Sequence, residues 1–231
     1  MAQTVFRVAI IGLGYISKTH LDNFTKIAGV EIAAICDVSD IRVRECARVY
    51  DVKHVFLDYR ELLGLQILDL VVICVPNNLH ECVTIDALNA GQNVLCEKPM
   101  TMNSTEAMVL IEASRKNHAL FMEAFMYRTH PQTQKIREII KEYFSEEPLE
   151  IEASFGFEAD VPEEHRLVNP ELGGGSILDI GCYPMSMSRM IVGVQEGKSF
   201  SNPINLESEG TLSENNIDLY AEAKLDFSNG S

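Results

Sequence analysis

The chain has 231 residues, of which 46% are hydrophobic and 23% are charged, values close to ordinary globular usage. This composition excludes wholesale disorder and collagen-like structure, and a chain of this length can bury a sizeable core. Nineteen basic against 34 acidic residues give a formal net charge of −15, which opposes binding to nucleic acid phosphates.

Membrane and secretory features are not expected. Arg7 and Lys18 bracket the most hydrophobic N-terminal stretch, so no run approaches the ~20 apolar residues of a membrane span. No basic leader precedes that stretch, so the sequence predicts a cytoplasmic protein without a signal peptide. The six cysteines form no Cys-x-x-Cys pair, which predicts buried, reduced thiols, and neither they nor the six histidines have the spacing of metal ligands.

The first half of the chain alternates short β-branched runs with helical patterns, which is typical of a parallel sheet covered by helices. The predicted strands are 6–11, 31–36, 70–75, 93–96 and 120–123. Most are continuously apolar, as expected of strands buried on both faces. Asn103, with Glu106 three residues later, predicts the cap of a helix that runs to about Asn117. Residues 1–125 are therefore predicted to form a doubly wound α/β domain.

The second half, 126–231, does not continue the regular alternation of strands and helices. It contains a predicted helix at 133–143, an alternating stretch at 149–157, a glycine-rich turn at 173–175 followed by a helical segment, a polar stretch at 199–216 and an alternating strand at 217–227. Alternation predicts a sheet with one wet face, so this half is predicted to be an α+β domain. The chain stops where a hairpin partner of the last strand is expected, which predicts an incomplete open sheet.

A glycine-rich motif follows the first predicted strand. Residues 12–17 read Gly-Leu-Gly-Tyr-Ile-Ser, and the next helix is predicted to begin there. Gly12 and Gly14 allow a tight turn and a close approach of the backbone to a pyrophosphate. Tyr15 and Ile16 belong to the same predicted cofactor-binding segment, and Ser17 takes the place of the usual third small residue. The alternative is a turn with a purely structural role.

An acidic residue stands at the end of the second predicted strand. Asp37 follows Gly14 by 23 residues, near the spacing of about 20 at which a carboxylate receives the ribose hydroxyls of adenosine. A carboxylate repels a 2′-phosphate, so NAD is favoured over NADP, while Arg42 lies near enough to leave the preference open. A solvated aspartate that begins a turn is the alternative.

A lysine stands at the carboxyl end of the predicted strand 93–96, where open α/β sheets bind ligands. Lys98, in the sequence Glu-Lys-Pro, can exchange a proton with a substrate hydroxyl if it lies, partly desolvated, beside the positive nicotinamide ring. Pro99 biases Lys98 towards an extended backbone. The alternative is an exposed lysine in a turn.

Five blocks of the sequence resemble the Gfo/Idh/MocA family of nicotinamide-dependent oxidoreductases, in the family's order. They are Gly-Leu-Gly at 12–14, Val-Pro-Asn-Asn-Leu-His at 75–80, Asn-Val-Leu-Cys-Glu-Lys-Pro at 93–99, Glu-Ala-Phe-Met-Tyr-Arg at 123–128 and Gly-Gly-Gly-Ser-Ile-Leu-Asp-Ile-Gly-Cys-Tyr at 173–183. The resemblance implies an N-terminal Rossmann domain and a C-terminal domain whose open sheet covers the active site. That sheet often mediates oligomerisation in the family, so a homo-oligomer is expected if the sheet is complete.

The resemblance also implies roles for residues of the first domain. Lys98 matches the catalytic lysine of the family's Glu-Lys-Pro motif, and Glu97 belongs to the same cofactor-binding motif. Pro76, Asn77 and His80 match a segment that lines the nicotinamide side of the cofactor. For His80, a helix-capping or surface histidine is the alternative.

In the second domain, Asp179 and Tyr183 match the family's second catalytic block. Tyrosine at the later position resembles the branch with glucose-fructose oxidoreductase, xylose dehydrogenase and dihydrodiol dehydrogenase. Residues i and i+4 share a helix face, but Gly181 and Pro184 weaken the assumption of a regular helix here. A core tyrosine with a satisfied hydroxyl is the alternative for Tyr183.

Arg128 and His130 fall where the family's chains border the substrate, although Arg128 can equally be a structural ion-pair residue. The predicted function is hydride transfer between NAD and a secondary alcohol of a sugar or polyol. The alternatives are a non-catalytic NAD(P)-binding regulatory protein and a subunit whose open sheet is completed by a partner chain. Family chains continue beyond the equivalent of Ser231, so a fragment, a truncated gene product or a shortened variant is expected.

Overall fold

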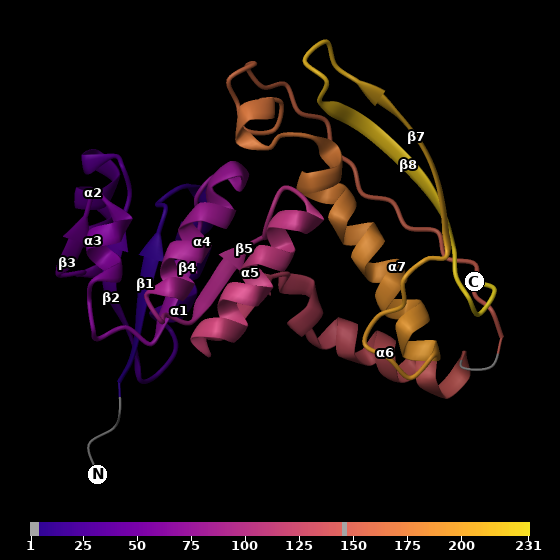
Figure 1. The fold of residues 1–231 in the computed structure, drawn as a ribbon, viewed down its shortest axis with the longest axis horizontal. Coiled ribbons are helices and arrows are strands. Elements are labelled where there is room, and N and C mark those ends of the chain that lie inside the picture. Colours follow the sequence, from indigo (N-terminus) through magenta and orange to yellow (C-terminus); the bar gives the residue numbers. More distant parts are fainter. Residues whose placement is uncertain (1–4, 145–146) are drawn as a thin grey trace. The chain divides into compact units, whose positions relative to one another are not determined.

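The computed structural model describes residues 5–144 and 147–231, so residues 1–4 of the first expected domain and residues 145–146 of the second lie outside the described residues. The predicted first domain, 1–125, therefore begins in residues that the structure does not describe. The chain divides into two compact units, Met1–Ala124 and Phe125–Ser231, which are described separately (Figure 1). Among the described residues, no helix is long and apolar enough to span a membrane.

The first unit contains a parallel sheet with the strand order β3-β2-β1-β4-β5-β6. The strands are β1 (Phe6–Ile11), β2 (Val30–Cys36), β3 (His54–Phe56), β4 (Leu70–Ile73), β5 (Val94–Glu97) and β6 (Phe121–Ala124). The helices are α1 (Tyr15–Phe24), α2 (Asp40–Tyr50), α3 (Tyr59–Leu63), α4 (His80–Asn89) and α5 (Ser104–Asn117). All five predicted strands are confirmed within a few residues, and so is the doubly wound α/β class.

The central strand shows why the sheet needs helices on both faces. Successive side chains of β1 point to opposite faces, and Val8, Ala9, Ile10 and Ile11 are all buried. Val8 and Ile10 pack with side chains of α1 and α2, whereas Ala9 and Ile11 pack with side chains of α3 and α4. Burying each large aliphatic side chain stabilises the fold by roughly 1.5–3 kcal/mol.

The sheet topology brings several loops to one edge. β1 pairs with β2 on one side and with β4 on the other, so the strand order reverses beside β1. In register, Ile11 lies beside Cys36 and beside Ile73 at the carboxyl ends of these three strands. Because parallel strands end at the same edge, the loops that follow β1, β2, β4 and β5 gather there, which is where open α/β sheets bind ligands.

The second unit combines helices with an antiparallel hairpin. Its helical elements are η2 (Met126–Thr129), α6 (Pro131–Tyr143), η3 (Pro170–Leu172), the π-helical turn η4 (Ile177–Gly181) and α7 (Cys182–Gln195), and its strands are β7 (Asn205–Leu212) and β8 (Asp218–Asp226). Ile140 of α6 packs against Met190 and Val194 of α7. Figure 1 shows α6, α7 and the hairpin β7–β8 of this unit.

Of the two alternating stretches of the second unit, one is a strand in the structure and the other is not. Residues 149–157 form no strand, and the ring of Phe155 packs against that of Tyr183, with 5.6 Å between centroids. The predicted strand 217–227 is confirmed as β8, but its partner β7 precedes it in the chain and lies inside the predicted polar stretch 199–216. Every residue of β7 is exposed, so the strand carries no buried apolar pattern that the sequence could reveal.

Candidate functional site

The loop after β1 depends on two glycines in different ways. Gly12 has a φ of +90°, and a Cβ there would lie 2.6 Å from the carbonyl carbon and oxygen of Cys74. Gly12 therefore lets the loop pass against the end of β4, a protein contact that the sequence analysis did not foresee. Gly14 is extended, and a Cβ there would meet nothing within 4 Å, so its open side has room for a ligand.

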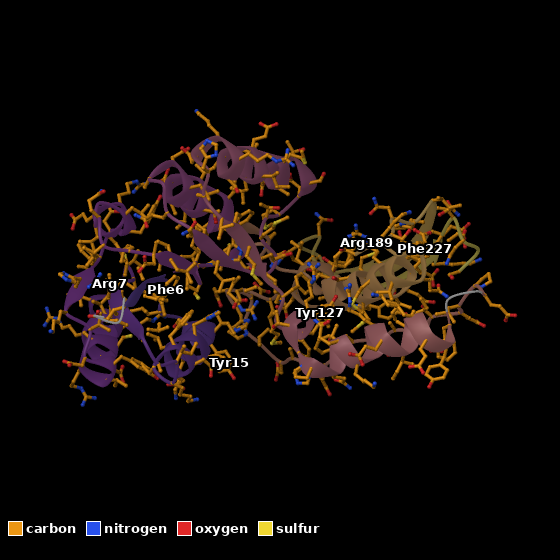
Figure 2. The ribbon with its side chains drawn as sticks, turned by 90° about the horizontal axis from the view of Figure 1, so that it is seen from below. Phe6, Arg7, Tyr15, Tyr127, Arg189 and Phe227 are labelled. Atoms are coloured by element: carbon orange, nitrogen blue, oxygen red, sulfur yellow. The ribbon has the colours of Figure 1, made fainter. Side chains whose placement is uncertain are left out.

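The helix that follows this loop begins with the features of an anion site. Its N-cap is Gly14, which has no side chain, and no acidic residue occupies the first turn. The first turn of a helix has N–H groups without intrahelical acceptors and the positive end of the helix dipole. Ser17 is buried and donates from Oγ to the carbonyl of Gly14 at 2.6 Å, which holds the turn closed. Tyr15, which Figure 2 labels, has 97% of its surface exposed, and Ile16 beside it is half-buried.

Asp37 connects the ends of β2 and β1. Its side chain accepts hydrogen bonds from the backbone N–H of Leu13 at 2.7 Å and of Ser39 at 2.8 Å. The residue is only 7% exposed, so the alternative of a solvated aspartate is wrong. The Arg42 guanidinium lies 3.7 Å from the same carboxylate. An ionised carboxylate has about four acceptor sites, so capacity remains for the hydroxyls of a ribose.

The Glu-Lys-Pro segment is anchored by carboxylates. Glu97 accepts a hydrogen bond from the backbone N–H of Lys98 at 3.2 Å, and its other oxygen lies 2.7 Å from Nε2 of His20 on α1. Glu123 of β6 accepts a hydrogen bond from the backbone N–H of Met100 at 2.9 Å. Lys98 is half-buried, and the peptide bond between it and Pro99 is cis.

His80 occupies an enclosed position at the start of α4. It is 1% exposed, with Nδ1 2.6 Å from the carbonyl oxygen of Pro99 and Nε2 2.9 Å from that of Val75. Burial lowers the pKa of His80, and the two contacts with backbone carbonyls oppose that shift. The surface alternative for His80 is wrong, and almost none of its ring is accessible to a cofactor. Pro76 is the N-cap and Asn77 the first residue of the 3-10 turn η1 (Asn77–Leu79) before it, and both keep their predicted role as a proposal.

In the second unit, the two predicted catalytic residues stand in different kinds of helix. Asp179 lies in the π-helical turn η4 and is 9% exposed, whereas Tyr183 lies in the first turn of α7. The sequence doubt about a regular helix at this point is therefore confirmed. Asp179 Oδ1 accepts a hydrogen bond from Nη1 of Arg166 at 3.0 Å. The Tyr183 ring lies edge-on to that of Phe125, with 5.2 Å between centroids.

Asp218 of β8 holds the start of this helical segment. Its Oδ2 accepts hydrogen bonds from Oγ of Ser176 at 2.8 Å and from the backbone N–H of Ile177 at 2.6 Å. Gly175 has a φ of +116°, and a Cβ there would collide with the Asp218 carboxylate. The glycine-rich turn thus allows a strand carboxylate to cap the segment that carries the predicted catalytic pair.

The two residues predicted to border the substrate make structural contacts. The Arg128 guanidinium lies over the Phe200 ring at 4.2 Å, and that of Arg189 lies 5.7 Å from the same ring. Figure 2 labels Arg189 and also Tyr127, whose hydroxyl is 2.7 Å from Oγ of Ser186. His130 caps α6, because its Nδ1 accepts a hydrogen bond from the backbone N–H of Gln132 at 3.1 Å. A role in substrate binding stays a prediction for both.

Four contact partners of the site were missed by sequence reasoning. They are His20, Glu123, Arg166 and Asp218. His20 had a local signal, since it lies four residues after Ile16 and so near the same face of α1, and Glu123 begins the sequence block 123–128. Glu123, Arg166 and Asp218 reach their partners across a turn, a strand pairing or a hairpin, which no short-range spacing predicts.

The cysteines are mostly inert by position. Four are buried, namely Cys36, Cys46, Cys74 and Cys96, whereas Cys182 is half-buried and Cys82 is exposed. Burial raises the pKa of Cys36 and Cys96 to about 12 and that of Cys46 to about 11. The prediction of buried thiols is confirmed for the four and is wrong for Cys82. Within residues 5–144 and 147–231, no group of three or more His, Cys, Asp or Glu is placed to hold a metal ion.

Comparison with known proteins covers nearly the whole chain. A family model described as "Oxidoreductase family, NAD-binding Rossmann fold" matches residues 6–125, and one described as "GFO/IDH/MocA C-terminal domain" matches residues 133–231. The chain is 31% identical, over 72% of its length, to 51% of the D-xylose 1-dehydrogenase (NADP(+)) 2 of Haloferax volcanii. It is 30% identical, over 95% of its length, to 64% of the trans-1,2-dihydrobenzene-1,2-diol dehydrogenase of Xenopus laevis. The chain thus spans between about half and two thirds of these curated relatives.

Solved structures show the same fold. An aldose-aldose oxidoreductase from Caulobacter crescentus, complexed with glycerol, aligns with a TM-score of 0.84 over 98% of this chain and 69% of that chain, at 20% sequence identity. At this identity the likeness concerns the fold alone.

Proposed function

The chain belongs to the Gfo/Idh/MocA family of oxidoreductases, and on this premise we propose that it transfers a hydride between a nicotinamide dinucleotide and a secondary alcohol or carbonyl group. The observation that carries the proposal is the set of loops at one edge of the parallel sheet. Gly14, Asp37 and Lys98 follow β1, β2 and β5 there, so an open anion site, a ribose acceptor and a proton-transfer group share this edge.

The dinucleotide would be held by residues whose geometry suits each of its parts. The pyrophosphate fits the start of α1, where Gly14 leaves open space and Tyr15 and Ile16 form the first turn. The adenosine ribose fits the Asp37 carboxylate, which retains acceptor capacity. Pro76 and Asn77, after β4, are assigned to the nicotinamide side.

NAD is the proposed cofactor in preference to NADP. The buried Asp37 carboxylate repels a 2′-phosphate, and Arg42, the nearby cation, lies 3.7 Å from that carboxylate. The negative charge of Asp37 partly offsets the attraction of the Arg42 guanidinium for a phosphate. The relative from Haloferax volcanii carries NADP(+) in its name, so the preference needs direct measurement.

The proposed chemistry divides between hydride and proton. When bound, the nicotinamide ring supplies or accepts the hydride. Lys98 exchanges the hydroxyl proton of the substrate as general acid or base, and Tyr183 is the second residue proposed for proton transfer. Asp179, held by the Arg166 guanidinium, accepts a hydrogen bond from a substrate hydroxyl and so orients it.

The proposed substrates are aldoses, polyols and vicinal cyclic diols, because the names of the similar proteins include a xylose, a dihydrobenzene diol and an aldose. The test is turnover of the purified chain with NAD+ or NADP+ against a panel of such alcohols, followed by the absorbance of reduced nicotinamide. Turnover of at least one alcohol, faster with NAD+, supports the proposal. Binding of NADH without turnover of any alcohol would favour the regulatory alternative, and absence of binding would remove the dinucleotide site.

A further inference from the structure

The segment after β5 is tied at three successive residues. The backbone N–H of Lys98 donates to Glu97, the carbonyl oxygen of Pro99 lies 2.6 Å from Nδ1 of His80, and the backbone N–H of Met100 donates to Glu123. Two of these ties come from neighbouring β-strands of the sheet. The third tie comes from His80, the first residue of α4, and reaches the carbonyl group of Pro99, the residue directly after Lys98.

The same histidine also contacts the loop after β4. Its Nε2 lies 2.9 Å from the carbonyl oxygen of Val75, which precedes the Pro76 and Asn77 segment. His80 is thus a single rigid ring between two loops of the carboxyl edge, and its 1% exposure leaves both nitrogens facing protein. Both ring nitrogens contact backbone carbonyl oxygens in this enclosed place, so direct chemistry on a substrate is not its role.

We propose that His80 is a positioning residue for Lys98, which it acts on by donating a hydrogen bond from Nδ1 to the carbonyl oxygen of Pro99. This inference rests on the proposed function, in which Lys98 transfers the proton. The contact with Pro99 is the shorter of the two, and a neutral imidazole has one N–H to give. A proton on Nδ1 fixes the backbone that carries Lys98 and so aims its ammonium group.

Whether Nε2, the second nitrogen of His80, also carries a proton depends on the charges around the ring. Nε2 can donate a hydrogen bond to the carbonyl oxygen of Val75 only when the ring takes up a second proton. The negative charge of Glu97 favours that proton, whereas the positive charge of Lys98 and burial of the ring oppose it. The tie to Pro99 needs only the neutral ring, so it persists at neutral pH.

Two amide variants separate the two contacts. The side-chain nitrogen of asparagine takes the place of Nδ1, whereas that of glutamine reaches towards the place of Nε2. In the holoenzyme with NAD+ and the best alcohol of the panel, we expect His80→Ala and His80→Gln to lower kcat by about 100-fold, as a misplacement of about 1 Å does. KM and the Kd for NADH are expected to change less than about 3-fold, and His80→Asn is expected to restore most of the kcat.

A second readout does not need turnover. Hydrogen exchange of the amides in segment 97–100, relative to β2 as an internal reference, reports whether the loop is held. We expect faster exchange there in His80→Ala and His80→Gln and near-native exchange in His80→Asn. Val83→Ala is the matched control, because Val83 is also buried on α4 and lines the core. It should lower the Tm while leaving kcat and the exchange of 97–100 unchanged.

The outcomes are distinguishable. If the native chain turns over no alcohol, the proposed function fails, and the exchange data still decide whether His80 holds the loop. If His80→Ala does not fold, the contrast between asparagine and glutamine carries the test. Equal kcat and equal exchange in these two variants, or native values in both, would overturn the proposal.

Discussion

The Asp37 carboxylate accepts a hydrogen bond from the backbone N–H of Leu13 at 2.7 Å, so the end of β2 holds the loop that follows β1. This contact gives Asp37 two roles at once. It shapes the glycine-rich loop from the protein side, and its remaining acceptor capacity is proposed to serve the ribose of the dinucleotide. The ribose acceptor and the pyrophosphate loop are therefore coupled through one side chain.

Asp37→Ala should weaken dinucleotide binding and narrow the preference for NAD over NADP. The variant removes the charge that repels a 2′-phosphate and leaves the Leu13 and Ser39 N–H groups without this acceptor. Loss of such bonds costs roughly 1–3 kcal/mol for each buried group left unsatisfied. The measurement is the ratio of the Kd values for NADH and NADPH, together with the free energy of unfolding in urea.

The control for Asp37 is Asp40→Ala, which removes an equal charge from an exposed residue on α2 that pairs with Arg44. This variant should leave the ratio of the two Kd values at the native level. A ratio that Asp37→Ala does not alter would show that another residue sets the cofactor preference.

Lys98→Met should lower kcat by about 100-fold or more while the Kd for NADH stays within a few-fold of the native value. General acid or base catalysis by one positioned side chain contributes typically 10²–10⁴-fold. Methionine keeps the length and apolar part of the side chain but cannot transfer a proton. Single-turnover kinetics with NAD+ and the chosen alcohol measure this effect, and the exposed Lys26→Met serves as the control. Unchanged turnover in Lys98→Met would contradict the role of this residue.

The fold of the first unit was predictable because its strands are long apolar runs. β1 was predicted with its observed bounds, and the helix α5 begins after the predicted cap, where Asn103 Oδ1 accepts from the backbone N–H of Glu106 at 3.0 Å. β3 was missed because it has three residues and lies at the edge of the sheet, with little buried surface. Short edge strands carry almost no periodic signal.

The residues of the site were predictable from motifs, but their surroundings were not. Lys98 belongs to a local sequence pattern, Glu-Lys-Pro. Its neighbours act through backbone groups that are distant in sequence: His80 contacts Pro99, 19 residues later, and Glu123 contacts Met100, 23 residues earlier. His80 was interpreted as lining the cofactor. In the structure it is buried between the carbonyl oxygens of Val75 and Pro99. Only the three-dimensional structure shows which loop a histidine at the start of a helix will hold.

Asp218→Ala should destabilise the second unit by about 1–3 kcal/mol, because Ser176 and Ile177 both donate to this carboxylate. The helical segment that carries Asp179 begins at these donors, so kcat should fall as well. Urea unfolding measures the stability change, with Glu214→Ala in the exposed turn between β7 and β8 as the control. If Asp218→Ala were no less stable than Glu214→Ala, the carboxylate would not hold the start of this segment.

The protonation of His80 should make stability depend on pH in a defined direction. An unperturbed histidine has a pKa of about 6.5, and burial lowers the pKa of His80 in the folded chain. Between these two values the unfolded chain binds more protons than the native chain, so the free energy of unfolding rises with pH. The contribution of His80 to the free energy of unfolding is complete above a pH of about 6.5 and falls as the pH decreases. It levels off below the pKa that His80 has in the folded chain.

This dependence can be isolated by comparing the native chain with His80→Gln, which cannot titrate at that position. Urea unfolding at several pH values between about 5 and 8 should show a steeper loss of stability towards low pH in the native chain, by at most about 1.4 kcal/mol per pH unit for one proton. His54→Gln, at an exposed position in β3, is the matched control and should preserve the native slope. A native chain that instead gains stability as the pH falls, relative to His80→Gln, would show that the buried ring carries a proton on both nitrogens. In that case His80 would donate to Val75 as well as to Pro99, and both loops would loosen as the pH rises.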